Sequence, residues 1–236
     1  MSNSYFRFKQ FTIHQDKASF KVGTDSVILG AWVDTGGAES ILDIGTGTGL
    51  LALMLAQRSG ALITAIEPDR DSFEQAYNNV KNCKWHERIC VVNTTLQDFS
   101  SGSGMYDLIV TNPPYFSGSL KNPDSRKAAS RHNDSLQPSD LLKAVDMLLH
   151  EDGSFYIILP YAEAAVFIAE ASDYGFFCNS MLKIKPSPSG SVIRLIMSLS
   201  RSAQRLSESF LTIGKGPRHE YTADYINLTK DFYPGF

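Results

Sequence analysis

The chain has 236 residues, of which 43% are hydrophobic and 20% charged, as is typical of a soluble globular protein with one large core. Its formal net charge of −3 excludes a generic nucleic-acid binder, because sequence-independent affinity for phosphate needs an excess of Lys and Arg. Its three cysteines lack the spacing of metal ligands or of a disulfide framework, and its apolar stretches are too short to span a bilayer, so we expect a cytoplasmic protein without a bound metal.

The predicted elements begin with a hairpin. Residues 5–22 alternate apolar and polar side chains around residues 14–17, where we place the turn, and an apolar helix is expected at residues 25–33. After it, apolar runs typical of buried strands alternate with helical patterns. Strands are expected at residues 40–44, 62–66, 89–92, 107–111 and 154–159. Helices are expected at residues 50–57, 70–82, 138–149 and 161–174.

The last part of the chain changes this pattern. Residues 176–184 and 191–199 are predicted to form an antiparallel hairpin. The tail from residue 208 ends in Y-T-A-D-Y-I-N-L-T-K-D-F-Y, which is predicted to form a short helix whose aromatic face packs into the core. The alternation of strands and helices predicts an α/β fold, a doubly wound and mostly parallel sheet. We divide the chain into an N-terminal hairpin and helix at residues 1–35 and a main domain at residues 36–236.

A glycine-rich motif, D-I-G-T-G-T-G, ends the first strand of the main domain. Gly45, Gly47 and Gly49 would let a ligand lie against the main chain at the start of the next helix. In a dinucleotide-binding loop the third glycine comes three residues after the second, where this chain has Leu50. Asp43 would suit a ligand with a cationic ammonium and would repel a pyrophosphate.

Two further acids complete this pattern. Glu67, after the strand at residues 62–66, is placed to accept hydrogen bonds from ribose hydroxyls, and Asp98 is placed to accept one from an adenine amino group. Together with the glycine spacing, these acids favour S-adenosylmethionine over NAD as the ligand.

A second motif, N-P-P-Y, follows the strand at residues 107–111. The Asn112 side-chain oxygen and the Pro113 carbonyl can accept both hydrogens of an exocyclic amine. Pro113 and Pro114 stiffen the turn, and either Tyr115 or Phe116 would stack on the ring that carries the amine. Unless the motif is a plain turn at a strand end, it predicts methyl transfer to a planar amine.

The segment K-N-P-D-S-R-K-A-A-S-R-H, directly after N-P-P-Y, carries four cations and one acid. The ordinary interpretation of such a run is a solvated surface loop, and the functional one is a local RNA contact through Arg126, Lys127 and Arg131. His132 in the same segment is either a surface residue or a further RNA contact.

The glycine loop, the two acids and N-P-P-Y resemble class I S-adenosylmethionine-dependent methyltransferases that act on amino groups. The fuller set resembles one branch, the bacterial tRNA-valine adenine-N6 methyltransferases, which modify the adenine 3′ of the anticodon. This narrower resemblance rests on F-R-F-K-Q-F-T, K-V-G-T-D-S-V-I-L-G-A-W and A-A-S-R-H-N, at residues 6–12, 21–32 and 128–133. It covers nearly the whole chain and implies a seven-stranded sheet with a C-terminal antiparallel strand.

The resemblance also implies S-adenosylmethionine as cofactor, an adenine N6 in a valine tRNA as target, and a position near the methionine end of the cofactor for Lys21 and Thr24. The candidate catalytic residues are Asn112, Pro113 and Tyr115. The candidate cofactor-binding residues are Lys21, Thr24, Asp43, Gly45, Gly47, Gly49, Glu67, Asp98 and Asn112. The candidate substrate-binding residues are Pro114, Phe116, Arg126, Lys127, Arg131 and His132.

Three alternatives stay open at this point. Methylation of a ribosomal RNA adenine needs the same site. Methylation of a glutamine amide in a release factor is disfavoured, because only about forty residues precede the first strand of the main domain, too few for a helical substrate domain. A catalytically silent binding module is disfavoured by the presence of Asp43, Glu67 and Asn112. A monomer that binds no membrane is expected.

Overall fold

The computed structural model describes residues 3–102, 104–114, 116, 136–217 and 220–236. Two short strands form an N-terminal hairpin, β1 (Tyr5–Arg7) and β2 (Thr12–His14). The remaining described strands form one central sheet and are β3 (Ser40–Ile44), β4 (Leu62–Glu67), β5 (Ile89–Asn93), β6 (Tyr106–Thr111), β7 (Leu149–Pro160), β8 (Phe177–Lys185), β9 (Arg194–Ser200) and β10 (Ser207–Thr212).

The described helices connect these strands or flank the sheet. In chain order they are α1 (Thr24–Trp32), α2 (Leu50–Arg58), α3 (Arg70–Lys81), the 3-10 turn η1 (His86–Arg88), α4 (Leu96–Ser100), α6 (Pro138–Leu148), α7 (Tyr161–Asp173) and α8 (Ala223–Thr229). None of the described helices is both long and apolar enough to cross a bilayer.

The order of the strands in the sheet is β10-β8-β9-β7-β6-β3-β4-β5. Every neighbouring pair is parallel except those that β9 makes with β7 and β8, which confirms the mostly parallel sheet with an antiparallel strand near the C-terminus. The chain winds outward from β3 to β5 and then returns to the other side of β3 with β6. In open α/β sheets ligands bind at such a reversal, outside the carboxyl ends of the strands.

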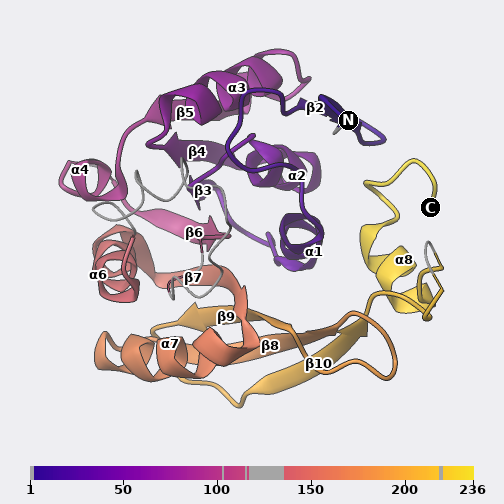
Figure 1. The fold of residues 1–236 in the computed structure, drawn as a ribbon. Coiled ribbons are helices and arrows are strands. Elements are labelled where there is room, and N and C mark those ends of the chain that lie inside the picture. Colours follow the sequence, from indigo (N-terminus) through magenta and orange to yellow (C-terminus); the bar gives the residue numbers. More distant parts are fainter. Residues whose placement is uncertain (1–2, 103, 115, 117–135, 218–219) are drawn as a thin grey trace, which may run out of the picture.

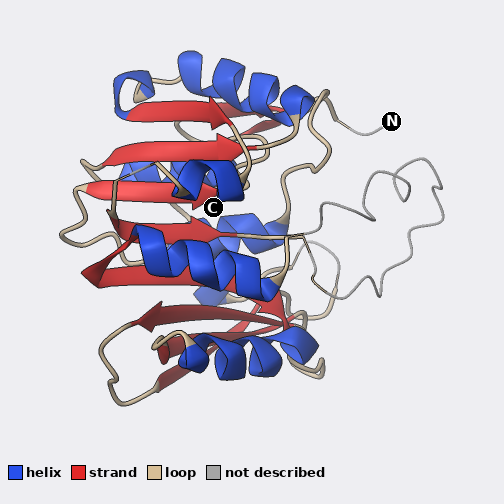
Figure 2. Cartoon of the chain, turned by 90° about the vertical axis from the view of Figure 1, so that its left-hand side faces the viewer, coloured by secondary structure: helices blue, strands red, loops and turns tan. Residues whose placement is uncertain are grey.

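Helices cover both faces of the sheet, as Figures 1 and 2 show. Side chains of α1, α2, α3 and α8 form one apolar cluster with one face of the sheet, and those of α4, α6 and α7 form a second cluster with the other face. Successive residues of β3 belong to opposite clusters, with Ile41 in the first and Leu42 in the second, as the alternation of a strand requires.

The predicted turn of the N-terminal hairpin is wrong. Strand β1 ends at Arg7 and β2 begins at Thr12, so the turn lies at residues 8–11. The Phe8 amide closes this turn by donating to the Phe11 carbonyl at 2.9 Å. Phe8 and Phe11 are both buried, and the centroids of their stacked rings lie 4.7 Å apart. Burial of these two aromatic rings stabilises a turn here rather than at the polar residues 14–17. The stretch expected to turn instead runs along α3, where Asn79 hydrogen-bonds the backbone of His14.

The C-terminal tail confirms its predicted core role. Tyr225 and Phe232 are 3% and 2% exposed, and the Tyr233 ring packs on Phe6 and Phe8 of the hairpin. The two chain ends therefore lie together. The sheet also has one strand more than the seven expected, because β10 pairs with β8 at its edge.

Candidate active site

The two sequence motifs begin at adjacent points of the sheet. Ile44, the last residue of β3, lies opposite Thr111, the last residue of β6, and the Thr111 hydroxyl donates to the Ile44 carbonyl at 2.9 Å. The glycine loop and N-P-P-Y therefore leave neighbouring strands at the same edge of the sheet. The reversal of the strand order, where a ligand site is expected, lies between these two strands.

The glycine loop has a backbone conformation that favours glycine. Gly45, Gly47 and Gly49 have φ values of 71°, 59° and 83°, in the left-handed region that favours glycine. A Cβ atom at Gly45 or Gly47 would point into open space, whereas one at Gly49 would meet the backbone of Ala76 at 3.5 Å. The open space at the first two glycines leaves room for a ligand, and Gly49 lies against α3.

Asp43 lies beneath this loop and is fully buried. Its Oδ2 accepts hydrogen bonds from the Thr46 hydroxyl at 2.6 Å and from the Ala52 amide at 3.2 Å, so it ties the loop to the first turns of α2. Its Oδ1 is buried and has no partner within the described residues. Burial raises the pKa of Asp43 to about 7 against these two hydrogen bonds, and the nearby charge of Glu67 adds to the rise.

Glu67 ends β4 and also hydrogen-bonds the loop. Its two oxygens accept from the Gly47 amide at 2.8 Å and from the Asp69 amide at 3.1 Å. Burial raises the pKa of Glu67, and the two amides oppose that rise. Each carboxylate oxygen has a second lone pair, so Glu67 can still accept from a ligand hydroxyl.

Asp98 lies in the first turn of α4 and is exposed. It forms a reciprocal cap with Thr95, whose hydroxyl accepts from the Asp98 amide at 3.1 Å and donates to Asp98 Oδ2 at 2.8 Å. The cap fixes the carboxylate at the end of the loop that follows β5.

Asn112 is half-buried after β6, and its amide nitrogen Nδ2 donates to the Ser26 hydroxyl at 2.8 Å. Within the part of the chain that the structure describes, no group donates to Asn112 Oδ1, so the acceptor end of this amide is free for a ligand. Pro113 is buried and Pro114 is exposed.

Phe116 is turned toward the core. Its ring stacks on that of Phe167 at 5.9 Å with an interplanar angle of 3°, and its amide donates to the Glu163 carboxylate at 3.1 Å. One face of the Phe116 ring is therefore already occupied. The predicted site residues Tyr115, Arg126, Lys127, Arg131 and His132 lie outside the described residues.

Lys21 and Thr24 are exposed at the start of α1, beside the residue that contacts Asn112. Gly23 caps α1, and Thr24 is the first residue of the helix. Asp25, the next residue, pairs with Arg194 of β9 at 2.8 Å.

Ser26, Glu163 and Arg194 were not predicted. Ser26 lies 86 positions from the asparagine it contacts, and Glu163 lies 47 positions from Phe116. No local spacing signals contacts over such separations.

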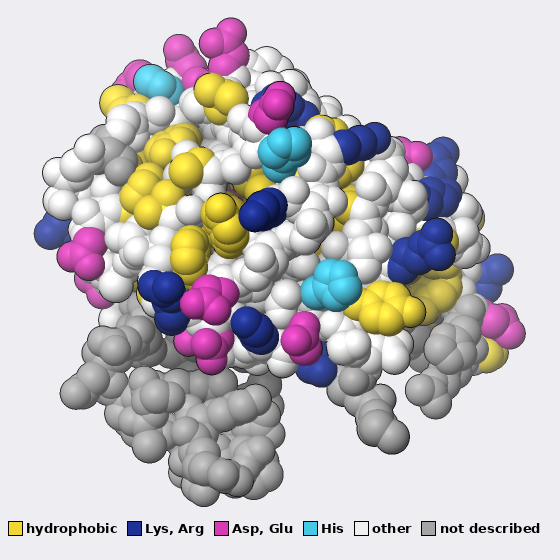
Figure 3. All heavy atoms as spheres, turned by 90° about the horizontal axis from the view of Figure 1, so that it is seen from above, with side chains coloured by type: hydrophobic (Ala, Val, Ile, Leu, Met, Phe, Trp, Pro, Cys, Tyr) yellow, Lys and Arg dark blue, Asp and Glu magenta, His cyan; other side chains and the backbone are white. Residues whose placement is uncertain are grey.

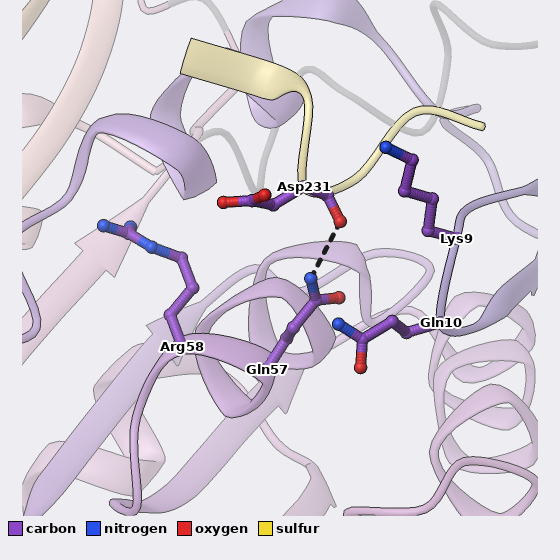
Figure 4. Close-up of a pocket in the computed structure, with 5 residues that line it drawn as sticks. All are labelled: Lys9, Gln10, Gln57, Arg58 and Asp231. Atoms are coloured by element: carbon purple, nitrogen blue, oxygen red, sulfur yellow. Dashed lines mark hydrogen bonds between the residues drawn. The ribbon is translucent and has the colours of Figure 1, made fainter. Parts of the chain in front are cut away.

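A hollow of about 540 Å³ lies away from this site, among Lys9, Gln10, Gln57, Arg58 and Asp231 (Figure 4). Gln57 and Arg58 end α2, so the hollow is at the opposite end of that helix from the glycine loop. Gln57 donates to the Asp231 carbonyl at 3.0 Å, and Lys9 donates to two carbonyls of the tail at 2.6 and 2.8 Å. These groups hold the chain ends together, and we assign the hollow a structural role.

The fold and the site are those of a methyltransferase, and this is the class of protein to which the chain belongs. The family model "Methyltransferase small domain" matches residues 17–159. Among solved structures, a predicted O-methyltransferase from Agrobacterium tumefaciens has a TM-score of 0.69 and 20% identity over 88% of this chain and 96% of that chain. A putative RNA methyltransferase from Pyrococcus horikoshii has a TM-score of 0.55 and 16% identity over 75% of this chain and 82% of that chain.

Full-length relatives narrow this class. The tRNA1(Val) (adenine(37)-N6)-methyltransferase of Trichodesmium erythraeum is 45% identical over an alignment of 237 positions that covers 99% of each chain. The protein of the same name from Bacteroides fragilis is 43% identical over 235 residues, again 99% of each chain. The chain belongs to the tRNA1(Val) (adenine(37)-N6)-methyltransferase family.

Proposed function

We propose that this protein transfers a methyl group from S-adenosylmethionine to N6 of an adenine in tRNA, and that the target is adenine 37 of a valine tRNA. The observation that carries the proposal is the Asn112 amide beside the glycine loop, with its nitrogen bonded to Ser26 and its oxygen free. The names of the full-length relatives support the choice of nucleotide and of tRNA. Because tRNA is the substrate, the site of action is the cytoplasm.

The residues present fit S-adenosylmethionine. The open space over Gly45 and Gly47 leaves room for a ligand on the main chain, and Glu67 keeps free lone pairs for its ribose hydroxyls. Asp98 would accept from the adenine amino group, and Lys21 with Thr24 would lie near the methionine end. We assign Asp43 an indirect part, because it is fully buried and bonded to the loop itself.

When bound, the cofactor supplies the methyl group as part of a sulfonium, so that the bond to carbon forms at N6 as the bond to sulfur breaks. Asn112 Oδ1 and the Pro113 carbonyl accept the two N6 hydrogens and stabilise the positive charge that develops on nitrogen. These bonds also turn the N6 lone pair out of the ring and toward the methyl group. After transfer, N6 loses one proton to water, and the enzyme supplies orientation and desolvation without a covalent intermediate.

We propose that the base stacks on Tyr115, since the Phe116 ring already packs on Phe167. On the face over α3, Lys and Arg side chains are interspersed with Asp and Glu (Figure 3). We place the phosphate contacts on the segment after N-P-P-Y, because it carries four cations against one acid, through Arg126, Lys127 and Arg131, with His132 next in the sequence. An anticodon-loop adenine is already outside a duplex, so a small clamp is sufficient.

The test is methyl transfer to purified RNA. The protein is incubated with methyl-labelled S-adenosylmethionine and a valine tRNA transcript, and the nucleosides are analysed by mass spectrometry. We expect one N6-methyladenosine per tRNA, absent from a transcript that has guanine at position 37. Equal labelling of both transcripts would overturn the choice of nucleotide. Labelling of ribosomal RNA or of a release factor with none on tRNA would overturn the choice of substrate.

A further inference from the structure

Helix α3 buries three polar side chains on one face. Ser72, Gln75 and Asn79 are 3%, 5% and 3% exposed, at positions where a helix that faces the core normally carries apolar residues. Burial of a polar group costs free energy unless a hydrogen bond compensates it. The partners of these side chains therefore show what this face of the helix holds.

Two of them bond the segment between β2 and α1, residues 15–23, which we call the strap. The Lys17 amide donates to Gln75 Oε1 at 3.1 Å, and the Ser19 amide donates to the Ser72 hydroxyl at 3.3 Å. The strap forms neither helix nor strand. Side chains of α3 thus supply partners that a sheet or helix would otherwise give to its backbone.

Apolar contacts contribute little to the middle of the strap. The side chains of residues 16–21 are exposed except that of Ala18, which is half-buried, and the largest of them, Phe20, is 59% exposed. This part of the strap is therefore held on α3 by polar contacts. A segment held in this way opens at a small cost in free energy when one of those contacts is removed.

Asn79 joins the residue before the strap to the glycine loop. Its Oδ1 accepts from the His14 amide at 2.9 Å, and its Nδ2 donates to the carbonyls of His14 and Thr48 at 2.8 and 2.9 Å. A backbone amide only donates and a carbonyl only accepts, so these three contacts fix the orientation of the Asn79 side chain. Thr48 lies between Gly47 and Gly49. One buried side chain thus links the start of the strap to the loop on which a ligand would lie.

The strap crosses the ligand edge of the sheet. Ser19 is bonded to the first turn of α3, which follows β4, and Ser26, three residues after the strap, is bonded to Asn112, which follows β6. Strand β3 lies between β4 and β6, so the strap passes the end of β3, where the glycine loop begins (Figure 1). Helix α3 therefore holds both the loop and the segment that crosses it.

We propose that Gln75 and Asn79 are positioning residues for the cofactor, which hold the strap and the glycine loop together so that both contact S-adenosylmethionine. This inference rests on the proposed function, since it takes S-adenosylmethionine as the ligand. Gln75 holds the strap, and Asn79 joins its start to the loop. Both act on cofactor affinity and leave the rate of methyl transfer at saturating cofactor unchanged, because their hydrogen bonds go to the strap, to His14 and to the loop.

The first test is isothermal titration of S-adenosylmethionine into the full chain, at a temperature where circular dichroism shows each variant to be folded. Gln75→Ala should raise the dissociation constant by about three- to tenfold, as for the loss of one hydrogen bond, and Asn79→Ala by about tenfold or more, since three backbone groups lose their partner. Gln75→Glu keeps an acceptor for the Lys17 amide and should bind more tightly than Gln75→Ala. Single-turnover rates at saturating cofactor should match the wild type.

Asn78→Ala is the matched control. Asn78 is the neighbouring asparagine on α3, is exposed, and donates within its own helix to the Glu74 carbonyl at 2.8 Å. It should bind S-adenosylmethionine as the wild type does. Wild-type affinity in the folded Gln75→Ala and Asn79→Ala variants would show that the polar face of α3 supports the fold alone, and would overturn the proposal.

A second measurement follows the strap itself and does not depend on activity. Trypsin cleaves after Lys17 and Lys21, which are both exposed on the strap, and mass spectrometry identifies each cut. S-adenosylmethionine should slow these cuts in the wild type, and Gln75→Ala should speed them about three- to tenfold without cofactor, whereas Asn78→Ala should not. Equal rates of cleavage in the wild type with and without cofactor would show that the strap does not cover the ligand, and would also overturn the proposal.

The two proposals fail in different ways. If the wild type binds S-adenosylmethionine but methylates no adenine in tRNA, the proposed function is wrong, and the titrations still test the role of α3. If the wild type methylates tRNA and the folded α3 variants bind the cofactor equally well, the proposed function stands and the role of Gln75 and Asn79 is wrong.

Discussion

The two halves of the site are built in different ways. The glycine loop of the cofactor half is held by contacts within residues 43–69, in which Asp43 bonds Thr46 and Ala52, and Glu67 bonds Gly47. The amine half is assembled from distant segments, since Asn112 is held from α1 at a separation of 86 positions. The first half is thus a local construction and the second a tertiary one.

The two halves also present different chemical groups to their ligands. The cofactor loop presents main chain, so its shape follows from three left-handed glycines and two buried carboxylates beneath them. The amine half presents one amide, whose use depends on which end faces the substrate. We therefore expect substitutions in the first half to change cofactor affinity, and those in the second half to change the rate.

The largest expected effect tests the amine half. Asn112→Ala should lower turnover by roughly a hundredfold or more, as for the loss of a transition-state hydrogen-bond partner. Its affinity for S-adenosylmethionine, measured by isothermal titration, should be nearly unchanged. Asn227→Ala, at an exposed position on α8, is the control and should be fully active. Full single-turnover activity in the Asn112 variant would contradict the amine-acceptor mechanism.

The next effect tests the cofactor half. Glu67→Ala should weaken binding of S-adenosylmethionine by about 1–3 kcal/mol, because it removes the ribose acceptor and leaves the Gly47 amide without its partner. Glu67→Gln keeps one acceptor and should lose less. Glu39→Ala, at an exposed position just before β3, should bind as the wild type does. Unchanged affinity in Glu67→Ala would show that Glu67 does not contact the cofactor.

A third substitution tests whether RNA contacts belong to the amine half. Replacing Arg126, Lys127 and Arg131 together by Ala should weaken tRNA binding. It should also make the slope of log affinity against log salt concentration shallower by roughly two, since a protein with three fewer phosphate contacts releases fewer counterions. Cofactor affinity should not change. Replacing the exposed Lys81 and Lys143 of α3 and α6 is the control. If the triple variant bound tRNA with the same salt dependence as the wild type, the phosphate contacts would lie elsewhere, with the N-terminal cations Arg7, Lys9 and Lys17 as the next candidates.

The smallest effect concerns the carboxylate beneath the glycine loop. Burial raises the pKa of Asp43 from its ordinary value of 3.8 to about 7 in the native state. Between these values the native chain binds more protons than the unfolded chain, so this group lowers the free energy of unfolding as the pH rises from about 4 to 7. Urea denaturation across that range should show a flatter pH dependence for Asp43→Asn than for the wild type. An exposed control, Asp152→Asn on β7, should keep the wild-type slope, and equal slopes in all three proteins would contradict the burial effect.

Much of the sheet could be predicted, because buried parallel strands leave continuous apolar runs. The prediction of strand residues 40–44 matches β3, and that of residues 107–111 differs from β6 by one residue. The edge strand β10 was missed because its side chains are mostly exposed, Phe210 being 60% exposed, so it has no apolar pattern and exists only where β8 offers a partner. The hairpin turn was misplaced because polar residues at 14–17 suggested a loop, and they lie along α3 instead.

The sequence by itself predicted the residues that we propose to carry the chemistry, and it determined the local shapes around them. Three glycines permit the left-handed backbone of the loop and two prolines restrict the turn after Asn112, so these local shapes follow from the spacing. Only the tertiary structure decided which side chain holds the Asn112 amide, because Ser26 reaches it through a helix anchored by an ion pair between residues 169 positions apart. Such contacts form because a doubly wound sheet brings the ends of non-consecutive strands to one edge, and the packing of helices against that sheet then selects which side chains meet there.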